Sequence, residues 1–155
     1  MKANALLASL TLFLGSLAAA APFTVSANGQ EVTDTKTGLI WRRCAEGMVF
    51  NSGTCAGTAT LFVHEQALQR ARSQSDGGWR LPNVKELASL VDRSVRDPSI
   101  DLTAFPATQS NNFWSSSPYV GNSGYAWYVN FFVGDVRVLD RSYYQYPVRL
   151  VRAGQ

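Results

Sequence analysis

Few side chains of this 155-residue chain could carry out nucleophilic or metal chemistry. The chain holds one histidine, His64, and two cysteines, Cys44 and Cys55. A zinc site would need His64, both cysteines and a carboxylate, and no spacing in the sequence suggests such a set. The G-x-S-x-G, G-x-x-x-x-G-K and H-E-x-x-H motifs are absent. We therefore expect no catalytic residue, no metal site and no cofactor.

The hydroxyls of Ser115, Ser116 and Ser117 and the acidic stretch Asp97–Asp101 are the next candidates for chemistry. A serine nucleophile needs an oriented base, and no motif links these serines to His64, which we expect on the surface of a helix. The acidic stretch lacks the oxygen spacing and the glycine of a dedicated calcium loop, so we interpret it as a capped turn. Nothing singles out two of the 11 acidic residues as a glycosidase pair.

The N-terminal segment indicates export. Lys2 is the only charged residue among residues 1–21. A basic start, an apolar run and an alanine-rich end are typical of a secretory signal peptide. We expect residues 1–20 to be that signal peptide, with an uncleaved N-terminal anchor as the alternative. Residues 21–155 would then form a single domain, without a membrane span, in the periplasm or outside the cell.

Export also bears on the two cysteines. A secreted protein with two cysteines most simply forms one disulfide, so we expect Cys44 and Cys55 to be joined. Closing this short loop stabilises the fold by roughly 3 kcal/mol in the chain-entropy model. The alternative is a redox or copper-binding cysteine pair.

Two short helices and several strands would position these residues. Helix-forming residues at 62–73 predict one helix, and Asn83 with Glu86 three residues later predicts the capped start of another. Residues 32–38 have the composition of a polar turn leading into a strand at 39–41, and residues 148–152 are typical of a closing strand. Large rings dominate the cores of small domains, so we expect Trp41, Trp114 and Trp127 to be buried.

The clearest strands, residues 126–133 and 136–141, flank Gly134-Asp135, a two-residue hairpin signal. This turn would set Tyr128 opposite Arg141 and Phe132 opposite Arg137. Because side chains alternate between faces of a strand, the hairpin divides into two sets. The set expected in the core is Trp127, Val129, Phe131, Val133, Val136 and Val138. The set expected at the surface is Tyr128, Asn130, Phe132, Arg137, Leu139 and Arg141.

We expect this aromatic and basic surface, with the neighbouring tyrosines, to bind a ligand. Aromatic rings stack on sugar faces, and arginines hold sulfate or carboxylate groups in bidentate fashion. Tyrosine, tryptophan and arginine also carry much of the energy of protein interfaces. The alternative is a solvated sheet face with a loop packed on the body. The candidate ligand-binding residues are Tyr128, Phe132, Arg137, Arg141, Tyr143 and Tyr144.

The segment Trp79-Arg80-Leu81-Pro82, with Glu86, has a structural interpretation. It would form a buried turn that holds the second helix in place, with Arg80 or Arg149 paired with a carboxylate. Together with the other motifs, this segment makes the chain resemble the Lcl C-terminal domain family, named after a bacterial collagen-like adhesin. The matching segments are Val32–Asp34, Thr37–Trp41, Cys44…Cys55-x-Gly57, Ala67-Leu68, Trp79–Leu87, Phe113–Ser116, Trp127 with Phe131, and Val148–Arg152.

Parts of this pattern also resemble formylglycine-generating enzymes and variable phage-receptor-binding proteins. These relatives imply an α+β, C-type-lectin-like fold, with two short helices packed on small antiparallel sheets and long loops. The cysteines that bind copper in formylglycine-generating enzymes have no counterpart in the C-terminal half. The Glu-Pro-Asn or Gln-Pro-Asp calcium signature of sugar-binding C-type lectins is also missing. The resemblance therefore implies neither oxidase activity nor calcium-dependent sugar binding.

These inferences favour an exported, non-catalytic binding module for glycans or another surface ligand. One alternative is a periplasmic structural or assembly protein that docks another protein through its sheet. Another is an enzyme on a scaffold similar to that of formylglycine-generating enzymes. Without Lys2, the chain has 13 basic and 11 acidic residues. That excess is too small to indicate nucleic acid as a partner.

Overall fold

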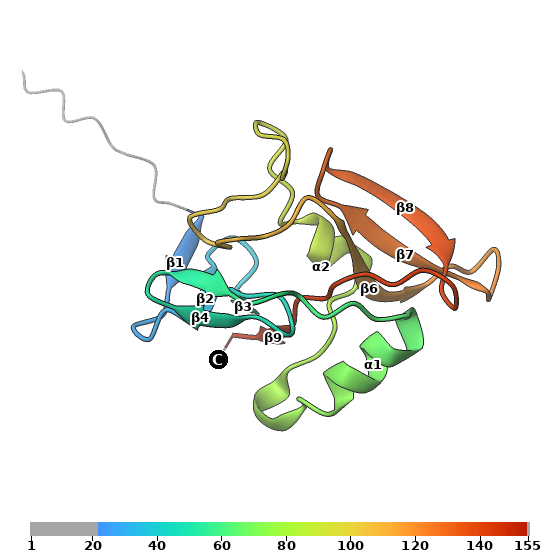
Figure 1. Cartoon of the computed structure of the whole chain (residues 1–155), viewed down its shortest axis with the longest axis horizontal. Coiled ribbons are helices and arrows are strands. Elements are labelled where there is room, and N and C mark those ends of the chain that lie inside the picture. Colours follow the sequence, from blue (N-terminus) through green and yellow to red (C-terminus); the bar gives the residue numbers. More distant parts are fainter. Residues whose placement is uncertain (1–21, 155) are drawn as a thin grey trace, which may run out of the picture.

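The structure is a computed structural model that describes residues 22–154 (Figure 1). These residues form two short α-helices, a 3-10 turn and small antiparallel sheets, which confirms the predicted α+β class. The predicted signal peptide, residues 1–20, lies outside them. Within residues 22–154, no helix is long and apolar enough to span a bilayer.

The first sheet joins the two ends of the described chain. Its strands are β1 (Phe23–Val25), β2 (Glu31–Asp34), β3 (Leu39–Arg42) and β9 (Val151–Ala153), in the order β1-β2-β3-β9. Strand β3 confirms the strand expected at residues 39–41. Residues 32–34, which were predicted to lie in a polar turn, belong to strand β2 instead.

The turn between β2 and β3 begins later because of one carboxylate. The side chain of Asp34, which is buried, accepts hydrogen bonds from the Lys36 backbone (2.9 Å) and the Thr37 hydroxyl (2.8 Å). Val32, two residues earlier, is fully buried on the same face of β2. The polar composition of this segment therefore reflects the turn at residues 35–38 and the solvent side of β2.

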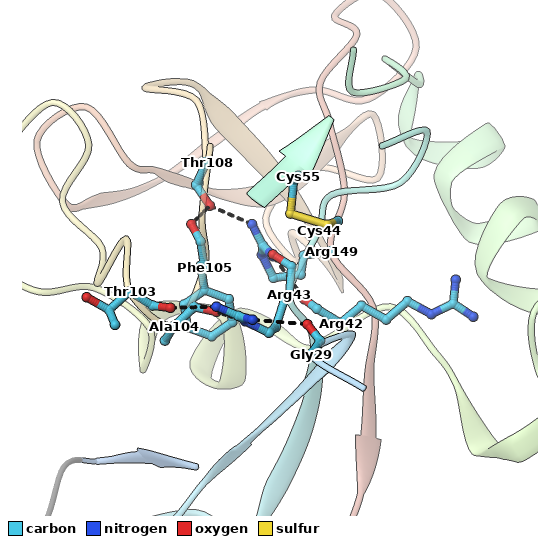
Figure 2. The surroundings of a disulfide bond; sticks show 10 residues. All are labelled: Gly29, Arg42, Arg43, Cys44, Cys55, Thr103, Ala104, Phe105, Thr108 and Arg149. Atoms are coloured by element: carbon cyan, nitrogen blue, oxygen red, sulfur yellow. Dashed lines mark hydrogen bonds between the residues drawn. A yellow bond between two sulfur atoms is a disulfide. The ribbon is translucent and has the colours of Figure 1, made fainter. Parts of the chain in front are cut away.

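A small hairpin, β4 (Val49–Asn51) and β5 (Thr54–Ala56), follows the first sheet. The predicted disulfide between Cys44 and Cys55 is confirmed, with the two Cα atoms 5.5 Å apart. It ties the second strand of this hairpin, β5, to the chain just after the end of β3 (Figure 2).

The helices lie where the sequence predicts them. Helix α1 spans His64–Arg72, the 3-10 turn η1 spans Asp76–Gly78, and α2 spans Val84–Ala88. Asn83 caps α2, because its side-chain oxygen accepts from the Glu86 backbone (2.9 Å) while the Glu86 carboxylate accepts from the Asn83 backbone (2.8 Å). Arg80 pairs with the same carboxylate at 2.7 Å, as the structural interpretation of this segment requires.

The third sheet has the order β6-β7-β8 and corrects the predicted hairpin register. Its strands are β6 (Asn112–Pro118), β7 (Tyr125–Asn130) and β8 (Asp135–Asp140). Tyr128 lies opposite Arg137, not Arg141, because the connection is a four-residue loop. Residues 131–133, predicted as strand, belong to that loop.

The side chain of Asn130 explains why the strand ends early. Its oxygen accepts a hydrogen bond from the Val133 backbone (3.1 Å), and its carbonyl accepts from Gly134 (2.9 Å), so the chain turns at once. Gly134 closes this loop with a φ of +78°, and a Cβ there would lie 2.7 Å from a methyl group of Val91. The glycine is therefore required both by its left-handed backbone and by close packing.

The two helices cover opposite faces of the third sheet. Leu87 of α2 packs in one buried cluster with Phe113 and Val129, whereas Ala67 of α1 packs in another with Trp114 and Tyr128. These strand residues alternate in sequence and therefore point to opposite faces. Both faces of the sheet are thus core over part of their length.

The predicted division of the hairpin into a buried face and an exposed face is therefore only partly correct. Trp41 and Trp114 are fully buried, as expected, but Trp127 is only partly buried and Val136 is 37% exposed. Both lie on the face predicted to be core. The five-residue helix α2 packs against β6 and β7, so Val136, opposite Val129 on the outer strand β8, is left partly uncovered, and Trp127 is covered in part by the ring of Tyr119.

Candidate functional site

Tyr128, the first of the candidate ligand-binding residues, is not on the surface. It is only 7% exposed, and its ring packs edge-on against Trp114 (6.2 Å between centroids) and, with a tilt of 38°, against Tyr146 (5.8 Å). Helix α1 covers this part of the sheet with the small side chains of Ala67 and Ala71. Desolvation raises the pKa of the Tyr128 hydroxyl. Tyr128 therefore supports the surface from beneath rather than contacting a ligand.

An exposed aromatic surface lies directly above it, in the turn after β8. Tyr143 is 76% exposed and Tyr144 39% exposed, and their rings meet edge-to-face at 5.0 Å. The ring of Tyr144 is nearly parallel to that of Tyr146, with 4° between the planes and 6.2 Å between the centroids. We call Tyr143, Tyr144 and Tyr146 the tyrosine platform.

The platform is held by its own turn and by the helix beside it. The Asp140 carboxylate accepts from the Ser142 backbone (2.8 Å), the Ser142 hydroxyl (2.7 Å) and the Tyr143 backbone (3.1 Å). The hydroxyl and backbone of Ser142 lower the pKa of Asp140. Tyr146 also exchanges two backbone hydrogen bonds with Phe62, just before α1. The rings are therefore preorganised, which reduces the entropy lost when a ligand binds.

One candidate arginine lies beside the platform. Arg141 is partly exposed, and its guanidinium contacts the Glu65 carboxylate of α1 at 3.3 Å. Arg141, Tyr143 and Tyr144 thus form one group at the end of β8.

Phe132 and Arg137 form a separate group. Phe132 is 49% exposed in the loop before β8, and Arg137, with a side chain 66% exposed, pairs with Asp135 at 2.6 Å. The six residues of β8 span about 20 Å, so Phe132 lies far from the platform. One copy of the chain therefore does not bring all the candidate residues together.

His64 is buried rather than on a helix surface, contrary to expectation. It is 1% exposed, its Nε2 lies 2.9 Å from the Ser115 carbonyl oxygen, and the Trp114 ring meets it at 5.4 Å. The prediction was wrong because α1 docks its first turn against β6. Desolvation lowers the pKa of His64, and Nδ1 has no partner among the described residues.

The serines near His64 take structural positions. The Ser115 hydroxyl donates to the Trp127 carbonyl (2.8 Å), and the Ser117 hydroxyl accepts from the Val84 backbone at the start of α2 (3.0 Å). His64 contacts the backbone of Ser115 and not its hydroxyl. This arrangement does not have the base-to-hydroxyl geometry of an activated serine.

Carboxylates likewise form no cluster. Within residues 22–154, no group of three or more histidine, cysteine or acidic side chains is placed to hold a metal ion. Asp101 accepts from the Thr103 backbone (2.7 Å) and the Ala104 backbone (3.2 Å), so this end of the acidic stretch is a capped turn, as expected.

Two arginines near the disulfide are buried, and neither forms an ion pair with a carboxylate of residues 22–154 (Figure 2). Arg43 donates to the carbonyl oxygens of Ala104 (2.8 Å), Gly29 (3.0 Å) and Thr103 (2.7 Å). Its position is structural, because it joins the chain after β3 to two other segments, one at Gly29 and one at Thr103-Ala104. Desolvation lowers its pKa.

Arg149 is 1% exposed and lies above the ring of Phe105 at 4.8 Å. It donates to the carbonyl oxygens of Arg42 and Arg43 and to the Thr108 hydroxyl (2.7 Å). Burial lowers its pKa to about 9, which leaves the guanidinium charged at neutral pH. Of the two arginines proposed to pair with a carboxylate, only Arg80 does so.

A hollow of about 270 Å³ lies between the first sheet and Trp79. The guanidinium groups of Arg42 and Arg152 approach the Trp79 ring at 4.9 Å and 5.1 Å. Glu46, 4% exposed, accepts from Arg42 (3.1 Å) and Arg70 (2.7 Å), so its charge is already compensated. This cluster was not predicted from the sequence, because its local signal is limited to the i,i+4 spacing of Arg42 and Glu46.

Comparison with known proteins gives one match. The model of the family described as the Lcl C-terminal domain matches residues 30–152. No curated protein and no solved structure matches the chain. The matched range includes both helices, the disulfide and the tyrosine platform.

Proposed function

The chain belongs to the Lcl C-terminal domain family, and on this premise we propose that it is an exported, non-catalytic binding module for glycans or another surface ligand. The basic residue Lys2, followed by a mainly apolar and uncharged run, supports export through a signal peptide at residues 1–20. The disulfide supports an oxidising compartment, the periplasm or the cell exterior.

The tyrosine platform is the observation that carries the proposal. Monomeric proteins expose few adjoining aromatic rings, and such patches often serve binding. Tyr143 offers the free face on which a sugar ring can stack, and Tyr144 is fixed beneath it by Tyr146. Arg141, at the edge of the platform, offers hydrogen-bond donors for a sulfate or carboxylate group on the same ligand.

The test is binding of the exported protein to a glycan array and to a heparin column. We expect the double substitution Tyr143→Ala, Tyr144→Ala to weaken binding by about tenfold or more, because exposed aromatic anchors dominate such interfaces. Val49→Ala, at an equally exposed residue of β4, is the control and should bind as wild type does. Unchanged binding by the double variant would remove the platform from the proposal.

The second candidate function is that of a periplasmic assembly protein that docks another protein. The partly uncovered side chains of Trp127 and Val136 on the third sheet favour it. Specific capture of one periplasmic protein, with no retention by any glycan, would support this function over the first. An enzyme on a similar scaffold would instead turn over a substrate, and loss of that turnover on substitution of platform residues would replace both proposals.

A further inference from the structure

The two outer edges of the third sheet differ. Along β6, the outer edge is covered, because Trp114 donates to the Pro147 carbonyl (3.2 Å) and Ser116 donates to the Pro82 carbonyl (2.7 Å). Strand β8, from Asp135 to Asp140, has no such cover: among residues 22–154, no backbone hydrogen bond reaches its outer edge. Figure 1 shows β8 along the outside of the molecule.

Strand β8 carries charges, Asp135, Arg137 and Asp140, but lacks several other features that prevent edge strands from pairing. All six of its residues pair with β7 in unbroken register, so no bulge bends it, and it contains no proline or lysine. Natural proteins generally protect regular edges with such devices. An edge of this length and regularity is suited to accept another strand.

The charges of β8 distinguish among the ways in which two copies could pair. In an antiparallel pair, residues directly opposite each other point to the same face of the sheet. When two copies of one strand pair about a two-fold axis, the axis must therefore pass through a residue and its symmetry mate, not between two neighbouring residues. An axis at Arg137 brings two arginines together. An axis at Leu139 sets Arg137 opposite the partner's Arg141. Like charges directly opposite are destabilising.

An axis at Val138 gives complementary charges instead. Asp135 then lies opposite the partner's Arg141, and by symmetry the pair forms at both ends of the interface. Val138 meets the partner's Val138 on the axis, and Val136, which is 37% exposed in the single chain, lies opposite the partner's Asp140. An axis at Val136 would also set Asp135 opposite the partner's Arg137, but it would pair only residues 135–137 of β8, so the longer ladder favours the axis at Val138.

We propose that two copies of this chain associate through antiparallel pairing of β8, centred on Val138, to form one continuous six-stranded sheet. This proposal does not depend on which ligand the tyrosine platform binds. In this register the loop before β8, which carries Phe132, and the partner's turn after β8 lie at the same end of the interface. The two groups of candidate residues that one copy separates would then lie at the same end of the dimer interface.

A charge exchange tests the register. Sedimentation velocity of the exported wild-type protein over a range of concentrations should show a reversible dimer. Asp135→Arg and Arg141→Asp each place like charges at both ends, so each should raise the dissociation constant by about tenfold or more. The double variant Asp135→Arg, Arg141→Asp restores opposite charges and should dimerise nearly as wild type does. Recovery in the double variant excludes misfolding as the cause of the single-variant losses.

A cysteine placed on the axis tests the geometry directly. Val138→Cys should form an interchain disulfide on mild oxidation, because directly opposite Cβ atoms lie about 5 Å apart. Val120→Cys, at a fully exposed position between β6 and β7, is the matched control and should not. The proposal would be overturned if the wild-type protein stayed monomeric, or if the single charge variants dimerised normally. It would also be overturned if the double variant did not recover, or if both cysteine variants cross-linked equally.

Discussion

Two pairs of arginines show how one residue type serves opposite purposes in this molecule. Arg43 and Arg149 are buried beside the disulfide, and their guanidinium groups donate to backbone carbonyls and one hydroxyl (Figure 2). Arg137 and Arg141 flank the free edge of the third sheet and contact carboxylates at the surface. The buried pair holds distant segments together, whereas the surface pair is accessible to ligands and partners.

The difference lies in what replaces water around the charge. Arg149 joins segments more than 100 residues apart, because its guanidinium donates to the carbonyls of Arg42 and Arg43. Without the guanidinium, these carbonyl oxygens have few other hydrogen-bond donors. Burying the charge lowers the stability of the fold, but removing it would lower the stability further. At the surface, water replaces any lost partner, and a single ion pair contributes little.

The largest effect should follow from removing the buried charge. We expect Arg149→Leu to lower the free energy of unfolding by roughly 3–5 kcal/mol, because it leaves two carbonyls and the Thr108 hydroxyl without a donor. Urea denaturation followed by circular dichroism measures the loss. Arg149→Lys should recover only part of it, since one ammonium cannot reproduce the fork of the guanidinium. A stability loss below about 1 kcal/mol would contradict the assigned role.

A smaller effect should come from His64, which links α1 to the third sheet. Burial lowers its folded-state pKa, so below the ordinary histidine pKa of about 6.5 the unfolded chain binds a proton that the folded chain does not. Stability should therefore fall as the pH drops from about 7 to 5. Melting temperatures across this range provide the measurement, and His64→Gln should flatten the profile. An equally steep profile in that variant would assign the pH dependence to other groups.

The smallest effect should follow from removing a surface charge. Arg137→Leu, the counterpart of the Arg149 substitution, should leave the melting temperature within about 1 °C of wild type, since solvent screens its pair with Asp135. Differential scanning calorimetry measures this difference. A loss comparable to that of Arg149→Leu would remove the distinction between the two pairs of arginines.

Features set by near neighbours in sequence could be predicted. The cap of α2 depends on Asn83 and Glu86, three residues apart, and the disulfide depends on the only two cysteines. The exposure of Tyr143 and Tyr144 agrees with their expected place beside the aromatic and basic surface of the hairpin. The burial of Trp41 and Trp114 needed only the preference of large rings for the core of a small domain.

Features set by docking between distant segments could not be predicted. Tyr128 and His64 are buried because α1 lies on the third sheet, and nothing near either residue in sequence encodes that contact. The hairpin register failed for a different reason. Residues 131–133 have high strand propensity, but the Asn130 side chain captures the Val133 backbone and starts the turn early.

The pairing of β9 with β3 has a practical consequence for experiments on this protein. Because β1 and β9 belong to one sheet, an affinity tag after the last strand leaves the chain at that sheet, and Figure 1 shows the end of β8 on the opposite side of the molecule. Immobilising the protein on a sensor surface through its C-terminus would therefore hold the turn after β8, which carries the platform, away from that surface. Coupling through lysine amines would attach the described domain at few positions, because its lysines are Lys36 and Lys85.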